Sequence, residues 1–210
     1  PPLLQGRRIA VARDAAFAFV YAANLALLQA LGAQVVAFSP LAGDGLPDCD
    51  ALWLPGGYPE LHAAALAACH ALRRQVQAHV RAGKPLWAEC GGLMVLAEQL
   101  VDAQGLSHAM WGLLPGRAVL GRRLAALGPH RWGMPGVDAP PLRGHSFHWS
   151  SFETPARPAW HTEAVGAAHG AGEPVYAEGS LRASWFHPWW PSSPRLAAWL
   201  FGAELPPCTH

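Results

Sequence analysis

The sequence predicts an α/β protein with a mostly parallel sheet flanked by helices. In the first half of the chain, short apolar runs alternate with segments of helical period, and the runs end in turns rich in Gly and Pro. Strands that alternate with helices favour parallel pairing, because each crossover helix returns the chain to the same end of the sheet. After about Gly112 the helical period disappears and Gly and Pro become dense. We interpret this second part as an antiparallel excursion on the same domain.

The elements of the first half follow from local patterns. Strands are expected at residues 8–12, 34–38, 51–54 and 85–89, and helices at 21–31, 61–81 and 93–100. Gly32 and Gly83 follow the first two helical segments, where a glycine commonly ends a helix. In the second half we expect short strands at 118–120, 145–149, 175–177 and 181–186, and a final helix at 194–202.

Length and composition indicate one globular domain. The chain has 210 residues, of which 51% are hydrophobic and 14% charged, and its formal net charge is +1. This balance gives no strong field for nucleic acid or an acidic membrane, and no apolar stretch reaches the ~18 residues of a membrane span. We expect residues 1–7 to be a linker end, 8–203 the domain and 204–210 a tail. The start lacks the pattern of a signal peptide, which predicts a cytoplasmic protein.

One of the four cysteines stands in an informative context. Cys49, Cys69 and Cys208 read as free thiols in a reducing compartment, and no pair has C-x-x-C spacing. Cys90 instead follows a buried strand and precedes two glycines and a helix, which is the layout of a nucleophile elbow. The turn would expose the sulfur at the carboxyl end of the sheet, and the helix N-terminus would lower the pKa of the thiol.

A cysteine nucleophile needs a base and an oxyanion hole. His187 ends an apolar strand, at the rim where parallel α/β sheets build their sites. The alternative for any single histidine is a surface or core residue. Gly91, directly after the nucleophile, and Gly57, in the turn after the third strand, would supply N–H groups to the oxyanion. The alternative for the Pro-Gly-Gly turn at 55–57 is an ordinary end to a strand.

Several ordered motifs resemble the class I glutamine amidotransferases, and more narrowly the glutaminase domain of cobyrinic (or hydrogenobyrinic) acid a,c-diamide synthases. The resemblance covers about residues 8–202. It rests on the segments 12–17 (Ala-Arg-Asp-Ala-Ala-Phe), 54–61 (Leu-Pro-Gly-Gly-Tyr-Pro-Glu-Leu), 88–92 (Ala-Glu-Cys-Gly-Gly), 112–116, 123–128, 144–150 (Gly-His-Ser-Phe-His-Trp-Ser) and 183–187 (Ala-Ser-Trp-Phe-His). The resemblance implies a flavodoxin-like class I amidotransferase fold and glutamine as the substrate.

The resemblance also implies a division of roles. Cys90 would attack the side-chain amide of glutamine, His187 would move the proton, and Gly57 and Gly91 would bind the oxyanion. A glutamyl thioester would then be hydrolysed by water. The ammonia would pass to an ATP-dependent ligase domain, which amidates the a and c acetate side chains of a corrin ring. No G-x-x-x-x-G-K-[S/T] phosphate loop is present in these 210 residues, so ATP and Mg²⁺ are expected only in that ligase domain.

Three positions depart from the common family pattern. Trp189 stands where many relatives carry a carboxylate two residues after the histidine, Ala88 replaces the glycine that opens the elbow, and Met94 replaces a glutamine. The resemblance therefore implies a Cys–His dyad, with glutamine held differently. For the substrate we consider Glu60 for the ammonium and Arg123 for the carboxylate, with an ordinary surface ion pair as the alternative for each.

Histidines and tryptophans give further signals. His145 and His148 are three residues apart on an expected strand, so they should face opposite sides and make a poor metal pair; no metal site is expected. Ten tryptophans are many for this length. We expect Trp185 to pack in the core, and Trp189 or Trp190 to dock the ligase domain, since aromatic residues are enriched at interfaces.

Other functions remain open at this level. The nearest alternatives are glutaminase domains of sister enzymes that amidate cobyric acid, a nickel tetrapyrrole precursor or a cell-wall lipid intermediate. A non-catalytic relative that kept the fold as a binding domain is another. A stress-type hydrolase or chaperone with a similar elbow would lack the long segment between the elbow helix and His187.

Overall fold

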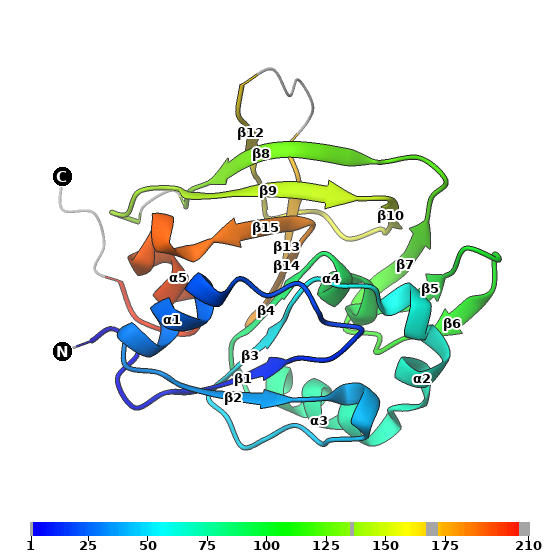
Figure 1. Ribbon diagram of the computed structural model, residues 1–210, viewed down its shortest axis with the longest axis horizontal. Helices are drawn as coiled ribbons and strands as arrows, with labels where there is room; N and C mark the ends of the chain where they lie inside the picture. Colours follow the sequence, from blue (N-terminus) through cyan, green and yellow to red (C-terminus); the bar gives the residue numbers. More distant parts are fainter. Residues whose placement is uncertain (1, 135–136, 167–171, 206–210) are drawn as a thin grey trace.

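A computed structural model describes residues 2–134, 137–166 and 172–205 of the chain. Its centre is a seven-stranded sheet of order β11-β13-β14-β4-β3-β1-β2 (Figure 1). β2, β1, β3, β4 and β14 pair in parallel, and β13 and β11 continue the sheet in antiparallel pairing. The predicted mostly parallel α/β architecture is therefore confirmed.

The strands of the first half lie where the sequence predicts them. They are β1 (Arg8–Ala12), β2 (Gln34–Phe38), β3 (Ala51–Leu54) and β4 (Leu86–Glu89). β3 and β4 are buried along their whole length, as a parallel strand between two helical layers must be. Because the strands run in parallel, their carboxyl ends meet at one edge of the sheet, and Gly56 and Cys90 follow directly there.

Helices cover both faces of the sheet. One face carries α1 (Ala22–Ala30) and α5 (Pro194–Leu200), whose Leu28 and Leu196 share a core with Trp53 and Trp87. The other carries α2 (Ala63–Ala68), α3 (His70–Arg81) and α4 (Gly91–Leu96), which pack around Leu52 and Leu54. Successive residues of β3 thus alternate between the two cores, as the two-residue period of a strand requires.

Two helix predictions are wrong in their extent. The long helix expected at 61–81 is divided into the short helix Pro59–His62, α2 and α3, with Cys69 in a non-helical conformation (φ −73°, ψ 51°) between α2 and α3. The helix expected at 93–100 ends at Leu96, where the chain enters β5 (Ala97–Val101). Pairing of β5 with two further strands supplies backbone hydrogen bonds that compete with the local helical preference.

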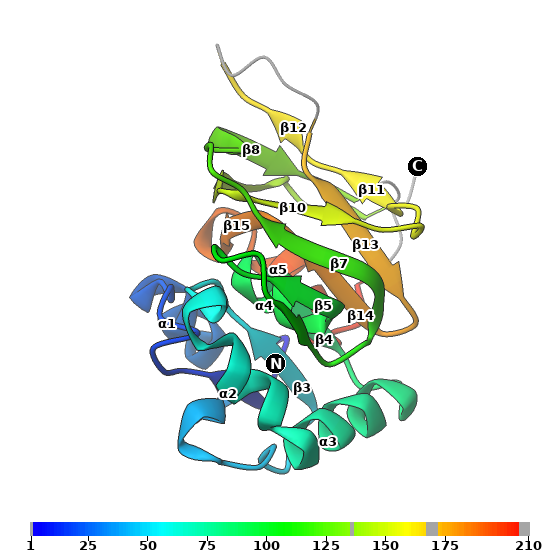
Figure 2. The same ribbon diagram turned by 90° about the vertical axis from the view of Figure 1, so that its right-hand side faces the viewer.

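The second half forms the predicted excursion, which is antiparallel apart from the parallel pairing of β5 with the strand Leu114–Leu120 (Figure 2). One four-stranded sheet has the order β10-β7-β5-β6, and another the order β12-β8-β9-β15. Their strands, besides β5, are β6 (Ser107–Ala109), β7 (Leu114–Leu120), β8 (Ala126–Trp132), β9 (Leu142–His148), β10 (Ser150–Glu153), β12 (Glu163–Ala164) and β15 (Phe186–Trp189). The remaining strands of the central sheet are β11 (Trp160–His161), β13 (Pro174–Glu178) and β14 (Leu181–Ser184).

The strand expected at 181–186 changes sheets. β14 pairs with β4 in the central sheet, and β15 pairs with β9 in the excursion, so the chain crosses between the two at Trp185. This crossing brings His187 above the end of β4 while anchoring it to β9. The excursion therefore forms one wall of whatever site lies at the carboxyl edge of the central sheet.

The chain ends pack onto the domain as far as they are described. Leu4 is fully buried and its N–H donates to the carbonyl of Leu31 (2.8 Å), while Arg7 donates to the carbonyl of Gly202 (2.9 Å). Cys208 and most of the expected tail fall outside the described residues. Among the helices of the described residues, none is long and apolar enough to cross a membrane.

Candidate active site

Cys90 occupies a sharp, strained turn between β4 and α4. Its φ is +48° and its ψ −104°, and among the described residues it alone takes a positive φ without being glycine. Such a conformation costs about 1–3 kcal/mol and persists only where the surroundings enforce it. Here the Cys90 N–H donates to the carbonyl of Ser184 (2.8 Å), and a Cβ added to Gly92 would lie 2.1 Å from the Leu54 oxygen. The predicted elbow is present.

The two glycines expected to form the oxyanion hole lie side by side. A Cβ on Gly91 would be 3.0 Å from the nitrogen of Gly57, so the two backbones approach without a side chain between them. A Cβ on Gly57 would collide with the carbonyl oxygen of Ala16 at 2.2 Å. Within the described part of the chain, the Gly57 N–H has no protein acceptor. The turns after β3 and β4 therefore lie side by side, and the role of Gly57 and Gly91 as an oxyanion hole stays a prediction.

His187 stands beside Cys90 across Gly56. A Cβ on Gly56 would lie 2.5 Å from His187 Cε1 and 3.6 Å from Cys90 Cβ, so the missing side chain of this glycine makes room for the imidazole. His187 is 4% exposed. In the described residues no hydrogen bond joins the thiol to the imidazole; Cys90 Sγ lies 3.9 Å from the Phe147 carbonyl oxygen. Catalytic hydrogen bonds are often long before substrate binds.

The electrostatics keep both groups neutral at rest. Burial raises the pKa of the Cys90 thiol to about 12, with the carboxylate of Glu89 adding to the effect. Burial, with the charges of His145 and His148, lowers the pKa of His187 to about 3. The expectation that the helix N-terminus lowers the thiol pKa is therefore wrong for this state. α4 has only six residues, and loss of hydration outweighs its weak dipole.

A buried carboxyl immediately precedes Cys90 in the sequence. Glu89 is 3% exposed and accepts a hydrogen bond from Trp87 Nε1 (3.2 Å). Burial raises the pKa of Glu89 to about 8, although the hydrogen bonds oppose this shift. The group is thus uncharged at neutral pH, which limits the penalty it imposes on a thiolate next to it in sequence.

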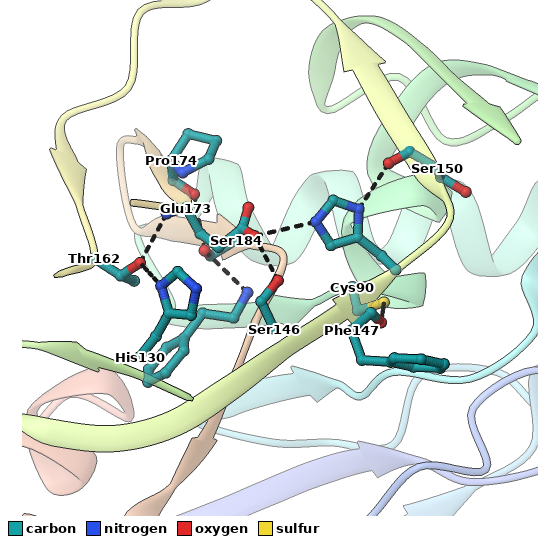
Figure 3. A network of polar contacts seen from close by, with 11 residues as sticks. Cys90, His130, Ser146, Phe147, Ser150, Thr162, Glu173, Pro174 and Ser184 are labelled. Atoms are coloured by element: carbon teal, nitrogen blue, oxygen red, sulfur yellow. Dashed lines mark hydrogen bonds and ion pairs between the residues drawn. The ribbon is translucent and has the colours of Figure 1, made fainter. Parts of the chain in front are cut away.

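A hydrogen-bonded network supports the wall opposite the elbow (Figure 3). His148 Nδ1 lies 2.7 Å from the Ser150 carbonyl oxygen and Nε2 lies 3.2 Å from Glu173 Oε1. Since a carbonyl only accepts, Nδ1 carries a proton and donates it. Ser146 Oγ donates to the same carboxylate oxygen. The ring also stacks on Trp185, with centroids 4.3 Å apart.

The network continues into the excursion. Glu173 N donates to Thr162 Oγ1 (2.8 Å), and that hydroxyl lies 2.8 Å from His130 Nδ1. Burial alone would raise the pKa of Glu173, but the hydrogen bonds from His148 and Ser146 and the charges of the two histidines outweigh it and lower the pKa. Glu173 is therefore a carboxylate, and both ring nitrogens of His148 at its side face an acceptor oxygen.

Cys90 and His187 open into one pocket of about 90 Å³. Its other lining residues are Phe19, Gly57, Tyr58, Glu60, Met94, Leu120, His145, Phe147, His148, Trp149 and Ser150. Glu60 thus lines the pocket, and burial raises the pKa of its carboxyl group. The positive charge of a bound ammonium group would lower that pKa again. Arg123 is exposed on the connection between β7 and β8 and does not line the pocket. The roles of Glu60 and Arg123 stay predictions.

Some residues in or beside the pocket carry no signal in the sequence. Glu173, which lies beside the pocket, is separated from His148 by 25 positions and follows a Gly-rich stretch that carries no motif. Phe19 follows an apolar segment and Tyr58 follows the Pro-Gly-Gly turn, and neither has a signal of its own for chemistry. His145 and His148 were noticed as a pair, and both line the same pocket, although their nitrogens have separate partners. Among the described residues, no three or more His, Cys, Asp or Glu side chains gather as metal ligands would.

The tryptophans beside His187 have different environments. Trp185 is 3% exposed, which confirms its place in the core. Trp190 is fully buried against Trp53, with ring centroids 4.3 Å apart, so the docking role considered for it is wrong. Trp189 is 42% exposed. It does not line the pocket; its ring packs on Tyr21, which packs on the pocket residue Phe19. We call Trp189 and the half-exposed rings of Phe19, Tyr58, Phe147 and Trp149 the aromatic rim.

Comparison with known families agrees with this site. Residues 8–194 match the family described as CobB/CobQ-like glutamine amidotransferase domain. A cobyrinate a,c-diamide synthase of Herminiimonas arsenicoxydans is 46% identical over 97% of this chain and 46% of its own length. A hydrogenobyrinate a,c-diamide synthase of Stutzerimonas stutzeri is 49% identical over 94% of this chain and 45% of its own. The chain spans about half the length of these curated relatives.

Solved structures show the same fold. A crystal structure of a glutamine amidotransferase superposes with a TM-score of 0.63 at 20% identity, covering 91% of this chain and 96% of the other. The structure of PurLQS from Thermotoga maritima superposes with a TM-score of 0.56 at 14% identity, over 86% of this chain and 87% of the other. The predicted flavodoxin-like class I amidotransferase fold is therefore confirmed.

Proposed function

Because the chain belongs to the family of CobB/CobQ-like glutamine amidotransferase domains, we propose that it hydrolyses glutamine and supplies ammonia for amidation of the a and c carboxylates of cobyrinic or hydrogenobyrinic acid, in cobalamin biosynthesis. The observation that carries the proposal is the meeting of a strained Cys90, His187 and the two glycine turns in one pocket. The names of the relatives at 46% and 49% identity support this acceptor over those of sister enzymes.

The reaction begins with a proton transfer between two buried neutral groups. His187 takes the proton of the Cys90 thiol as the sulfur attacks the amide carbon of glutamine, so thiolate and imidazolium never exist apart. Each ion alone is penalised by burial, but the two charges stabilise each other when they form together. The oxygen of the tetrahedral intermediate accepts hydrogen bonds from the Gly57 and Gly91 N–H groups.

Collapse of the intermediate completes the first half of the reaction. The imidazolium of His187 protonates the departing nitrogen, the C–N bond breaks, and ammonia leaves a glutamyl thioester on Cys90. Water, deprotonated by the now neutral His187, attacks the thioester and releases glutamate and the thiol. We assign Glu60 to the ammonium group of glutamine, a role that its position in the pocket lining supports.

The ammonia acceptor belongs to a second domain. Relatives about twice as long as this chain support a second, covalently joined domain. We expect this domain to be an amidoligase that uses ATP and Mg²⁺ and binds the corrin, and the whole protein to act in the cytoplasm. We place its docking surface on the aromatic rim, because these half-exposed rings surround the pocket through which ammonia must leave. Apolar rings at the centre of an interface also exclude water from the path of ammonia.

The decisive experiment is mass spectrometry after incubation with 6-diazo-5-oxo-norleucine, a glutamine mimic that alkylates amidotransferase cysteines, with the amidoligase domain present. We expect one adduct on Cys90, blocked by excess glutamine, and glutamine hydrolysis that disappears in Cys90→Ala. Cys69→Ala is the matched control, because that thiol lies outside the pocket. Labelling that glutamine does not block, or hydrolysis that survives Cys90→Ala, would contradict the proposal.

A further inference from the structure

The imidazole of His187 lacks the partner that usually orients a catalytic histidine. A base of this kind is generally held by a third polar group. Here Nδ1 of His187 is buried and has no hydrogen-bond partner among the described residues. Trp189, which stands at the family's carboxylate position, turns its half-exposed ring onto Tyr21 instead, with centroids 5.6 Å apart. Something other than a hydrogen bond must therefore hold the ring.

The ring of His187 is held between two aromatic rings. His145 stacks on one side, with centroids 5.0 Å apart and planes inclined by only 15°. Phe19 presents its edge at 4.7 Å, with planes inclined by 64°. Gly56 closes the slot with its backbone, since even a Cβ there would meet Cε1 at 2.5 Å. Aromatic pairs in these two geometries are favourable beyond their buried area.

The walls of this slot are themselves fixed. His145 lies opposite His187 in the pairing of β9 with β15, and its Nδ1 is 3.1 Å from the hydroxyl of Tyr21. Phe19 is tied to the turn by a hydrogen bond from its N–H to the Gly56 carbonyl (3.0 Å), and its ring packs edge-on to Tyr21 at 5.2 Å. Three separate elements thus converge on one orientation of the imidazole.

We propose that His145, held by Tyr21, is a positioning residue that orients the His187 ring by stacking, in place of the missing carboxylate. The inference rests on the proposed function only for its kinetic readout. The orientation of the ring can be measured without any reaction.

Three variants separate stacking from other roles. His145→Phe keeps a flat ring, His145→Ala removes it, and Tyr21→Phe removes only the hydroxyl that holds it. We expect kcat for glutamine hydrolysis, with the amidoligase domain present, to fall about 10- to 100-fold in His145→Ala with KM nearly unchanged, because small misplacements of catalytic groups have effects of this size. We expect kcat to fall about fivefold in Tyr21→Phe, as for the loss of one hydrogen bond. His145→Phe should stay within about threefold of wild type, since its ring replaces the stacking partner.

Nuclear magnetic resonance of ¹⁵N-labelled histidine provides the second readout. The His187 ring should give one sharp set of resonances in wild type and His145→Phe, and a broadened or multiple set in His145→Ala. His161→Ala, at an exposed strand far from the pocket lining, is the matched control. A kcat that is unchanged in His145→Ala, a loss in His145→Phe as large as in His145→Ala, or a rise in KM alone would each overturn the proposal.

The two readouts also distinguish this inference from the proposed function. If wild type does not hydrolyse glutamine but the His187 resonances broaden in His145→Ala, the function fails and the positioning role stands. If wild type is active and the resonances stay sharp in His145→Ala, the positioning role fails alone.

Discussion

Glu173 and His148 form a buried hydrogen-bonded pair beside the pocket, with 3.2 Å between Oε1 and Nε2 and only 8% of each side chain exposed. Replacing the carboxylate of such a pair leaves buried donors without a charged acceptor, which costs about 1–3 kcal/mol. We therefore expect Glu173→Gln to lower the free energy of unfolding by about this amount, measured by urea denaturation at pH 7. Glu163→Gln, which breaks the exposed Arg131–Glu163 pair, should cost about 1 kcal/mol or less.

The lowered pKa of Glu173 predicts how the stability of the protein changes with pH. Because the pKa of Glu173 is lowered in the folded protein, its stabilising effect is present above the ordinary value of 4.5 and is lost as the pH falls through the folded pKa. The difference in stability between wild type and Glu173→Gln should shrink as the pH is lowered below 4.5. An equal difference at pH 7 and at pH 3 would contradict the assignment of a charged carboxylate to Glu173.

The buried thiol predicts slow alkylation of free Cys90 at neutral pH. With a pKa near 12, the thiolate fraction rises about tenfold per pH unit across the accessible range. The rate of iodoacetamide labelling at Cys90, followed by peptide mass spectrometry, should therefore climb without a plateau up to pH 10. A plateau near pH 7 would show instead that the elbow stabilises the thiolate before substrate binds.

Glu89 predicts a loss of stability as the pH rises. Its pKa is about 8 in the folded protein and 4.5 ordinarily, so the unfolded chain releases the proton first. Each pH unit between these values lowers the free energy of unfolding by about 1.4 kcal/mol, and the loss is complete above pH 8. Glu89→Gln should therefore become more stable relative to wild type between pH 5 and pH 8 in urea titrations. Glu178→Gln controls for loss of an exposed carboxylate; equal pH profiles for wild type and Glu89→Gln would refute the argument.

Replacing Gly56 by alanine should impair catalysis while the fold stays intact. In Gly56→Ala the new methyl group would overlap His187 Cε1, so the imidazole must leave its slot. We expect kcat for glutamine hydrolysis to fall about 100-fold or more, as for a misplaced base. Gly133→Ala is the matched control, because a Cβ there meets nothing closer than 3.6 Å. Normal turnover in Gly56→Ala would mean that His187 does not act from the position described.

Replacing the two neighbouring tryptophans should have different effects, one on stability and the other on binding of the amidoligase domain. Trp190→Ala should lower the free energy of unfolding by about 3–5 kcal/mol, because it empties a fully buried site. Trp189→Ala should change stability by less than about 1 kcal/mol but weaken binding of the amidoligase domain at least tenfold, as loss of an interface aromatic does. Calorimetry of the separate domains measures both; unchanged binding in Trp189→Ala would remove Trp189 from the docking surface.

Much of the fold could be predicted because its signals are local. The bounds of β1, β2 and β3 follow from short apolar runs and the turns that end them. The break at Cys69 and the end of α4 at Leu96 could not be predicted, because in both places tertiary contacts override a continuous helical pattern. Helical preference is worth only tenths of a kcal/mol per residue, which strand pairing easily exceeds.

The sequence by itself determined which residues form the candidate site, since Cys90, the two glycine turns and His187 each carry their signal in a few neighbouring residues. The tertiary structure alone decided how these groups are held and charged. The stacking of His145 on His187 requires the chain to cross from β14 to β15, and the pair of Glu173 with His148 joins distant segments. Burial, which sets the pKa values of Cys90 and His187, is a property of the whole packed domain, and no local pattern encodes it.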